Sequence, residues 1–303
     1  MEGAPTASPP PTRIPMELSL LPQALVSGVL AAGLYALVSV GLALAIGVIG
    51  IVNFAHGEFF MVGAFFAYQL FVSFGFDPLL SILFVAPALF VIGALLFQTT
   101  IRFVLKAPEL NQMLLTFGIG IILQNLALSI WGGDPRSIGA VPYRAVGLQF
   151  GSVSVGLVPL GSFVISVLLV GGLYYVLART PIGRAMRAVA QNRVGAGLVG
   201  LEVNRVYLVA FALSALLAGI GGVMIAVIQS PTPTIGLAFT LKAFAIVVLA
   251  GLGNIRGIVS ASLLVAVAES LVATLLPNGD ALRNAVFFAI IFVTLVYRSW
   301  RKV

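Results

Sequence analysis

The polar residues that interrupt otherwise apolar stretches are the side chains of this sequence that could do chemistry. The densest group is Asn53, His56 and Glu58, in the segment IVNFAHGEFF. A second group, Gln124 and Asn125, lies in GIGIILQNLALSI. Polar and ionisable groups are costly in a bilayer and commonly mark substrate or ion pathways. These five residues therefore predict the polar lining of a translocation path.

Both groups also have structural explanations. Asn, Gln and His side chains hydrogen-bond between membrane helices for roughly 0.6–2 kcal/mol each, so Gln124 and Asn125 could serve packing alone. His56 and Glu58 could instead mark a membrane boundary.

Lys242 and Glu269 complete the set of ionisable candidates. A lysine can also extend its long side chain to the membrane surface, which is the alternative for Lys242. A secondary transporter driven by an ion gradient would need proton or Na⁺ sites, for which Glu58 and Glu269 are the candidates. Ion-coupled transport is therefore an alternative, and a structural membrane scaffold is a third.

Several kinds of chemistry are excluded by residues that the sequence lacks. The chain contains no cysteine and one histidine, so it offers neither thiolates nor a multi-histidine metal site. No G-x-x-x-x-G-K-[ST] phosphate loop occurs. No nucleophile lies near a candidate base in the sequence, because the polar residues are scattered across the apolar spans. We therefore expect no catalytic residues, no metal, no cofactor and no enzymatic activity.

The composition is that of a polytopic helical membrane protein. Of the 303 residues, 60% are hydrophobic and 8% are charged, whereas a soluble domain carries about a quarter charged residues. The formal charge of +7 arises mostly from residues that flank apolar spans. Membrane topology thus explains this charge better than binding to nucleic acid does.

Eight stretches approach the length of about 20 residues that a spanning helix needs. They lie at about 20–40, 57–74, 79–101, 110–131, 157–178, 206–229, 257–276 and 282–298. Two shorter apolar pieces, about 42–55 and 240–253, are interrupted by glycine and read as short or broken membrane helices. The fold class is therefore all-α and polytopic, with ten elements, or eight if both short pieces are re-entrant.

The distribution of basic residues orients these elements. With both termini in the cytoplasm, the cytoplasmic segments hold twelve Lys and Arg residues and the external segments hold three. Such an excess is expected on the cytoplasmic side. We therefore expect a multi-pass membrane protein in contact with lipid, and the family resemblance described below implies the plasma (inner) membrane of a prokaryote.

The longest external segment, 131–156, contains turn residues followed by an alternating pattern typical of a short hairpin. It is a candidate surface for an external partner. Five elements precede it and five follow, so the two halves would have opposite orientations, as in an inverted repeat. No repeat is evident in the sequence itself.

The segment 179–206 is a basic block between two spans. It holds five arginines and a single acidic residue, so it cannot cross the bilayer and should lie in the cytoplasm. Its apolar residues have the spacing of short amphipathic helical turns, broken by Gly195, Gly197 and Gly200. Such turns would present a docking surface, although a solvated loop is the alternative.

Three parts of the chain follow from these patterns. Residues 1–19 are Pro-rich and polar, which predicts a disordered tail without the features of a signal peptide. Residues 20–298 form the transmembrane domain and include the 179–206 loop. Residues 299–303 form a basic cytoplasmic C-terminus.

Four stretches resemble a known family, the permease subunits of branched-chain amino acid ABC importers, and specifically the LivH type. They are GLYALVSVGLALAIGVIGIVNFAHGEFFMVGAF, LLTFGIGIILQNLALSIWGGDPRS, GRAMRAVAQNRVGAGLVGLEVNRV and LKAFAIVVLAGLGNIRGIVSASLLVAVAES. The resemblance covers about residues 20–297 in order. It implies a permease for branched-chain (Leu, Ile, Val) or related amino acids. Permeases for urea or short amides share the fold and are the nearest alternative.

The resemblance also implies partners and a role for the basic block. The partners are a LivM-like sister permease, two cytoplasmic ATP-binding subunits that use the ATP, and an external substrate-binding protein. The 179–206 segment corresponds to the family's coupling loop, whose short helix contacts the ATPase. The residues that match this loop are Gly183, Arg184, Arg187, Ala196, Gly200 and Arg205. The chain departs from the family at Gln191 and Asn192, where many relatives carry acidic residues.

Overall fold

The computed structural model describes residues 20–139, 141–251, 254–276 and 278–300. The predicted tail at 1–19 and residues 301–303 of the predicted C-terminal segment lie outside this part of the chain.

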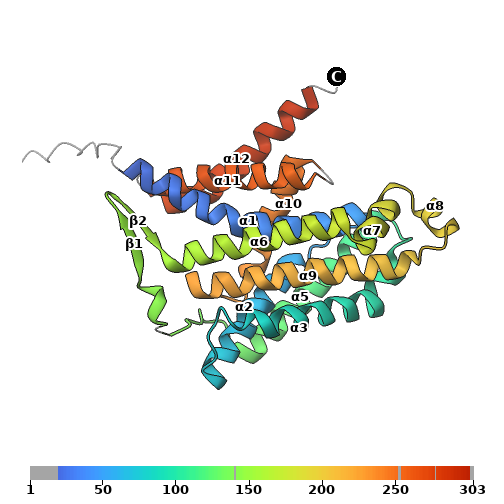
Figure 1. Ribbon diagram of the computed structural model, residues 1–303, viewed down its shortest axis with the longest axis horizontal. Helices are drawn as coiled ribbons and strands as arrows, with labels where there is room; N and C mark the ends of the chain where they lie inside the picture. Colours follow the sequence, from blue (N-terminus) through green and yellow to red (C-terminus); the bar gives the residue numbers. More distant parts are fainter. Residues whose placement is uncertain (1–19, 140, 252–253, 277, 301–303) are drawn as a thin grey trace, which may run out of the picture.

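Helices dominate the described residues (Figure 1). They are α1 Leu21–Ile49, α2 His56–Phe74, α3 Ile82–Leu96, α4 Arg102–Val104, α5 Glu109–Trp131, α6 Leu157–Arg179, α7 Pro181–Gln191, α8 Arg193–Leu198, α9 Val203–Ile228, α10 Ile235–Ala250, α11 Ile255–Leu275 and α12 Gly279–Trp300. A π-helical turn, Phe97–Ile101, joins α3 to α4, and a 3₁₀ turn spans Pro142–Arg144. The strands β1 Gly147–Phe150 and β2 Val153–Gly156 pair antiparallel, which confirms the predicted hairpin.

Seven helices in the described part are long and apolar enough to cross a membrane. They are α1, α2, the continuous run from α3 through α4, α5, α6, α9 and α11. Helix α10 and a segment within α12 are apolar but shorter. The predicted all-α polytopic class is thus confirmed. The inverted repeat stays a prediction.

The expected break after residue 40 is absent, so the count of ten separate elements is wrong. The short piece predicted at about 42–55 is largely the end of α1, which is 29 residues long and continues to Ile49. Glycine within the helix does not stop it. The helix ends at Gly50, whose φ of +85° favours glycine and whose N–H donates to the Ile46 carbonyl.

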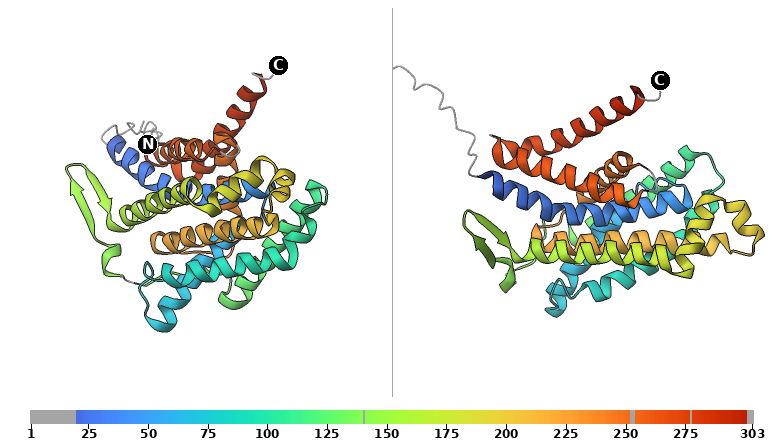
Figure 2. Two further views of the ribbon diagram at one scale, coloured as in Figure 1. Left: turned by 45° about the vertical axis from the view of Figure 1, so that its right-hand side comes forward. Right: turned by 45° about the horizontal axis from the view of Figure 1, so that its top comes forward.

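The two ends of α1 lie at opposite ends of the bundle. At its start, the Gln23 side chain and the Ser154 backbone of the hairpin exchange two hydrogen bonds of 3.0 and 2.7 Å. At its other end, Gly47 and Met186 of α7 line one cavity. Figure 2 shows the hairpin and the start of α1 together, far from α7 and α8. The sequence predicted that the N-terminal side of the chain and the 179–206 loop lie at the same face of the bundle. This prediction is wrong for Leu21, because α1 runs through the bundle as a single helix from the hairpin end to α7.

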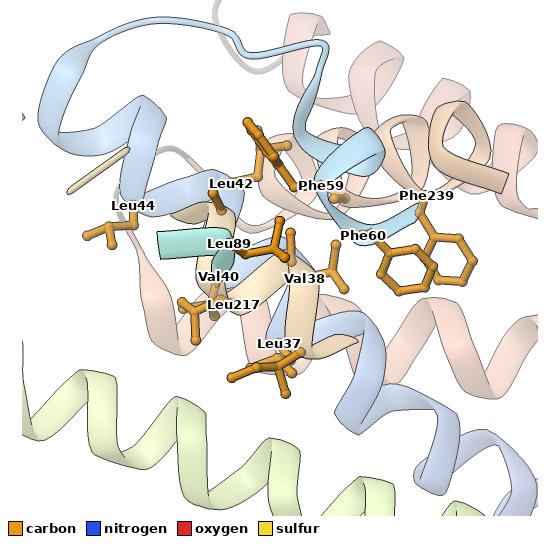
Figure 3. Packing of buried hydrophobic residues seen from close by; sticks show 14 of the residues in the cluster. Leu37, Val38, Val40, Leu42, Leu44, Phe59, Phe60, Leu89, Leu217 and Phe239 are labelled. Atoms are coloured by element: carbon orange, nitrogen blue, oxygen red, sulfur yellow. The ribbon is translucent and has the colours of Figure 1, made fainter. Parts of the chain in front are cut away.

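The core forms around α1, α2 and α9. Figure 3 shows Leu37 and Val38 of α1, Phe60 of α2, Leu217 of α9 and Phe239 of α10 packed together. The Phe60 and Phe239 rings stack with centroids 4.0 Å apart. Since lipid tails are as apolar as these side chains, close van der Waals packing rather than water exclusion holds such a core together.

Small residues let α2 and α9 approach backbone to backbone. A Cβ atom at Gly222 would overlap the Phe60 carbonyl oxygen, and one at Gly63 would overlap Gly219. Ser214 and Ala218, which precede Gly222 at four-residue intervals, are also buried. The small-residue stripe of α9 is therefore an interhelical packing surface.

We expect Gly222→Ala to destabilise the bundle by roughly 1–3 kcal/mol, because the added methyl group has no space between α2 and α9. Thermal unfolding in detergent would measure the change. Gly118→Ala is the matched control, because Gly118 is also helical and a Cβ atom there meets nothing within 4 Å. Equal midpoints for the two variants would contradict the close approach.

Candidate functional site

The connection 50–55 enters the bundle without regular helix, and hydroxyl groups hold its backbone. The Phe54 N–H donates to Thr116 Oγ1 of α5 at 3.2 Å, and the hydroxyl of Thr240 on α10 donates to the Phe54 carbonyl at 3.3 Å. The Ala55 N–H donates to the side chain of Asn53 at 3.0 Å. Backbone groups at membrane depth need such partners, and irregular backbone is tolerated there only where protein or a cavity surrounds it.

His56 begins α2 in the interior of the bundle. One ring nitrogen, Nε2, lies 2.9 Å from the Val38 carbonyl of α1, and the other, Nδ1, lies 3.3 Å from Ser214 Oγ of α9. The side chain is fully buried. Its place in a translocation path or at a membrane boundary stays a prediction, and its contacts tie α2 to α1 and α9.

Glu58 is buried on another side of α2. Its carboxylate packs against Gly236 of α10, and its side chain lies beside Gly120 of α5. Only 5% of its surface is exposed, and Oε2 has no hydrogen-bond partner among the described residues. A buried carboxylate oxygen without a partner is costly. This oxygen is therefore the chemically least satisfied acceptor of the predicted path.

Gln124 and Asn125 occupy different surroundings on α5. Gln124 follows Thr116 and Gly120 at helical four-residue intervals and is half-buried, so it continues the α5 face that meets α2. Asn125 is exposed, and its amide donates to the Ile121 carbonyl at 2.8 Å. The structure thus associates Gln124 with the Glu58 side of α2, and it turns Asn125 away.

Lys242 makes an intramembrane ion pair that the sequence did not reveal. Its Nζ lies 3.0 Å from Glu269 Oε1 of α11 and 2.9 Å from the Tyr35 hydroxyl of α1. That hydroxyl donates to Glu269 Oε2 at 2.6 Å. The alternative that Lys242 extends to the membrane surface is wrong, because Glu269 compensates its charge inside the bundle and the Tyr35 hydroxyl accepts a hydrogen bond from it. The only sequence signal was that both residues are ionisable within apolar stretches.

The basic block is helical, as expected, and it forms two short helices. Thr180 caps α7 by accepting from the Gly183 N–H at 3.1 Å, and Asn192 caps α8 by accepting from the Gly195 N–H at 2.9 Å. The break between the helices falls at Asn192. Gly195 and Gly197 lie inside α8 and do not break it, whereas Gly200 adopts a φ of +85° just after it.

The two faces of α7 differ in chemistry. Gly183, Met186 and Val189 are buried against the bundle, and a Cβ atom at Gly183 would overlap the backbone of α6. Arg184 and Arg187 are exposed. The helix thus rests on the bundle by one face and presents positive charge with the other.

The tip of the block exposes large apolar side chains. Leu198 is 84% exposed and Val199 is 78% exposed, while Ala196 is buried beneath them. Arg205, at the start of α9, pairs with Glu202 at 2.7 Å on the surface. The sequence pattern placed Leu198 and Val199 in an amphipathic turn, but their exposure became evident only from the fold. We call Arg184, Arg187, Leu198 and Val199 the α7–α8 surface.

The similarity to known proteins extends over the whole helical region. Residues 24–295 match the family model "Branched-chain amino acid transport system / permease component". BraD, a high-affinity branched-chain amino acid transport system permease protein of Pseudomonas aeruginosa, is 31% identical, with 91% of this chain and 93% of the relative covered. LivH of Escherichia coli K12 is 27% identical over 90% and 92%, and LivM of the same organism is 28% identical over 78% and 61%. No solved structure matches the chain.

Proposed function

Since the chain belongs to the family of permease components of branched-chain amino acid transport systems, we propose that it is a membrane subunit of an ATP-driven importer for branched-chain or related amino acids. A permease component is not itself an enzyme. ATP hydrolysis then occurs on two separate cytoplasmic subunits, a LivM-like permease stands beside this chain, and an external binding protein delivers the substrate. The relatives BraD, LivH and LivM, which are permease proteins of branched-chain amino acid transport systems, support the amino acid class.

The observation that carries this proposal is the α7–α8 surface. Arg184 and Arg187 of α7 are exposed, and so are Leu198 and Val199 at the end of the following helix α8. Burying such an aliphatic side chain in a partner's pocket gains about 1.5–3 kcal/mol, and arginine is favoured at protein interfaces. The surface is therefore suited to a partner with an apolar pocket and acidic residues, as expected of the ATP-binding subunit. Gly183, Ala196, Gly200 and Arg205 are proposed to support this surface.

We place the α7–α8 end of the bundle in the cytoplasm and the hairpin end outside. The excess of basic residues in the 179–206 segment supports this orientation. Because Leu21 lies at the hairpin end, the start of α1 then lies outside. The C-terminus stays cytoplasmic in this proposal.

The proposed translocation path runs past Asn53, His56 and Glu58, with Gln124 on the adjoining face of α5. The unpartnered Glu58 Oε2 supports this role most directly. His56 supports it less, because both ring nitrogens contact groups of α1 and α9. Asn125 lies on the exposed face of α5. It would line a path only if a second subunit covered that face and the path ran between the two subunits.

Uptake of labelled leucine, urea and acetamide tests the proposal. The chain would be deleted from its host and restored together with the sister permease, the ATP-binding subunits and the binding protein proposed above. We expect leucine uptake that needs every subunit and fails when the ATPase cannot hydrolyse ATP. Uptake of urea or acetamide alone would shift the substrate class. Uptake that persists without the ATPase but collapses with the ion gradient would replace the proposal by secondary transport.

We expect the double variant Leu198→Ser/Val199→Ser to weaken association with the ATP-binding subunits by tenfold or more, since truncation of a central interface residue costs about 2 kcal/mol. Affinity purification of the complex in detergent measures this loss. Leu126→Ser/Ile130→Ser is the control, because Leu126 and Ile130 are also exposed but lie on α5. Equal losses in both variants would contradict a specific role for the tip.

A further inference from the structure

Helices α6 and α11 both pack on α1 and lie on either side of it (Figure 1). An apolar groove of about 540 Å³ runs between them. Ala32, Gly33 and Ala36 of α1 line it and are buried, whereas Val167 of α6 and Val259 of α11 line it and are exposed. The groove therefore has a buried floor and opens onto the outer surface of the bundle, which the bilayer surrounds.

The length of this groove matches one leaflet of the bilayer. Its α6 wall extends from Phe163 to Tyr174, which at 1.5 Å per residue is about 16 Å of helix. The hydrocarbon core of a bilayer is about 30 Å thick, so one leaflet contributes about 15 Å. A single acyl chain would therefore fit along the groove.

The groove is polar mainly at one end. Tyr174, near the end of α6, and Arg256, at the start of α11, line that end. Arg256 Nη2 donates to the Tyr174 hydroxyl at 3.0 Å, and the guanidinium lies 5.8 Å from the centre of the Tyr174 ring. Tyrosine is enriched where a membrane meets water. This end of the groove is thus suited to a lipid headgroup, and the rest of it to a lipid tail.

Arg256 retains donors with which it could bind a phosphate. A guanidinium carries five N–H donors, and the Tyr174 hydroxyl is the hydrogen-bond acceptor that the described residues supply. Arg256 is exposed, and no carboxylate in the described part of the chain forms an ion pair with it. Arginine commonly binds phosphate by two parallel hydrogen bonds. The charge at this end therefore favours an anionic headgroup.

The charged end of the groove lies beside α7. A second cavity shares Tyr174 and Ile255 with the groove, and Met186 and Arg187 of α7 line it. A headgroup at Arg256 would therefore lie at the end of the bundle that we place in the cytoplasm.

We propose that this groove binds a phospholipid of the cytoplasmic leaflet with an anionic headgroup. One acyl chain lies on Ala32, Gly33 and Ala36, and the phosphate accepts hydrogen bonds from Arg256. This inference goes beyond the proposed function, because a lipid would bind here whatever the chain transports. A helix of the sister permease is the competing occupant, but the unpaired charge of Arg256 at the end of an apolar groove favours the lipid.

Native mass spectrometry of the full-length chain in detergent tests the headgroup. The probes are dioleoyl phosphatidylglycerol and dioleoyl phosphatidylcholine, which have identical acyl chains. The anionic lipid should bind about fivefold more tightly, the factor expected from one basic residue near a membrane surface. Equal binding of the two lipids would overturn the proposal.

Two arginine variants locate this preference. Arg256→Gln should remove it. Arg179→Gln is the matched control and should keep it, because Arg179 is also exposed near the α7 end of the bundle but does not line the groove. Equal effects of the two substitutions would overturn the assignment of the headgroup to Arg256.

Two neighbouring glycines test the groove itself. Gly171 lines it and Gly172 does not, and a Cβ atom at either position meets nothing within 4 Å. Gly171→Phe should weaken binding of both lipids by about tenfold or more, because the ring occupies the space of the acyl chain. Gly172→Phe should leave binding unchanged. Equal affinities of the two variants would overturn the groove as the position of the lipid.

The same measurement on the complex with the sister permease separates the two occupants. The lipid should remain bound after assembly. Its loss on assembly, with Gly171→Phe but not Gly172→Phe blocking assembly, would assign the groove to the sister permease and overturn the proposal. Glycerol 3-phosphate, which has no acyl chain, should not displace the lipid, and displacement by it would reduce the site to an anion site. Each of these contrary results would leave the proposed function intact, because uptake is measured separately.

Discussion

The double variant Arg184→Glu/Arg187→Glu is expected to abolish ATP-driven uptake while the helix bundle stays folded. Both arginines project from the exposed face of α7, and its buried face, with Met186 and Val189, is untouched. Reversal replaces attraction to an acidic partner surface with repulsion, and like-charge contacts across an interface cost several kcal/mol. Uptake and co-purification of the ATP-binding subunits should both fall at least a hundredfold.

The control for this variant carries the same change in charge elsewhere. Arg102→Glu/Lys106→Glu alters two exposed basic residues at the junction of α4 and α5, and we expect it to retain the ATP-binding subunits. Thermal unfolding in detergent should be similar for both double variants. If Arg184→Glu/Arg187→Glu keeps normal uptake and association, α7 does not couple the chain to an ATPase.

Lys242→Met is expected to cause the largest loss of stability of any single side-chain change considered. It removes the partner that Glu269 meets at 3.0 Å and leaves a buried carboxylate among α1, α10 and α11. Breaking a buried ion pair on one side costs roughly 3–5 kcal/mol, whereas replacing both partners by apolar residues is often neutral. The double variant Lys242→Met/Glu269→Met should therefore recover most of the loss.

Unfolding in detergent, followed by circular dichroism, measures this cycle. Lys106→Met is the control, because Lys106 is exposed on the connection before α5, and its substitution should change the free energy of unfolding by less than about 0.5 kcal/mol. A Lys242→Met variant as stable as Lys106→Met would show that the ion pair contributes nothing. A double variant less stable than Lys242→Met would show that the hydrogen bond from the Tyr35 hydroxyl to Glu269 stabilises the bundle by more than the unpaired carboxylate costs.

Much of the architecture could be predicted from the sequence, because hydropathy and charge are properties of local stretches. A membrane span needs about 20 apolar residues wherever it lies, so most helices were expected within a few residues of their observed bounds. Helical turns in the basic block and a short hairpin within 131–156 were also expected from local patterns. One error was local as well: α1 passes through Gly47 without a break.

The site could be predicted only as a set of candidate residues. Asn53, His56 and Glu58 stand within six positions of one another, yet His56 faces α1 and α9 while Glu58 faces α5 and α10. Consecutive helical residues point about 100° apart, because 3.6 residues make one turn. Which neighbours they meet depends on segments up to 180 residues away, such as Gly236.

The sequence by itself determined a polytopic helical bundle with a basic loop, because the bilayer imposes length, apolarity and charge bias on each stretch separately. Only the tertiary structure decided that Leu21 lies opposite α7 and α8, that Lys242 pairs with Glu269, and that Leu198 and Val199 are exposed. These features depend on contacts between residues distant along the chain, and no local pattern encodes such contacts.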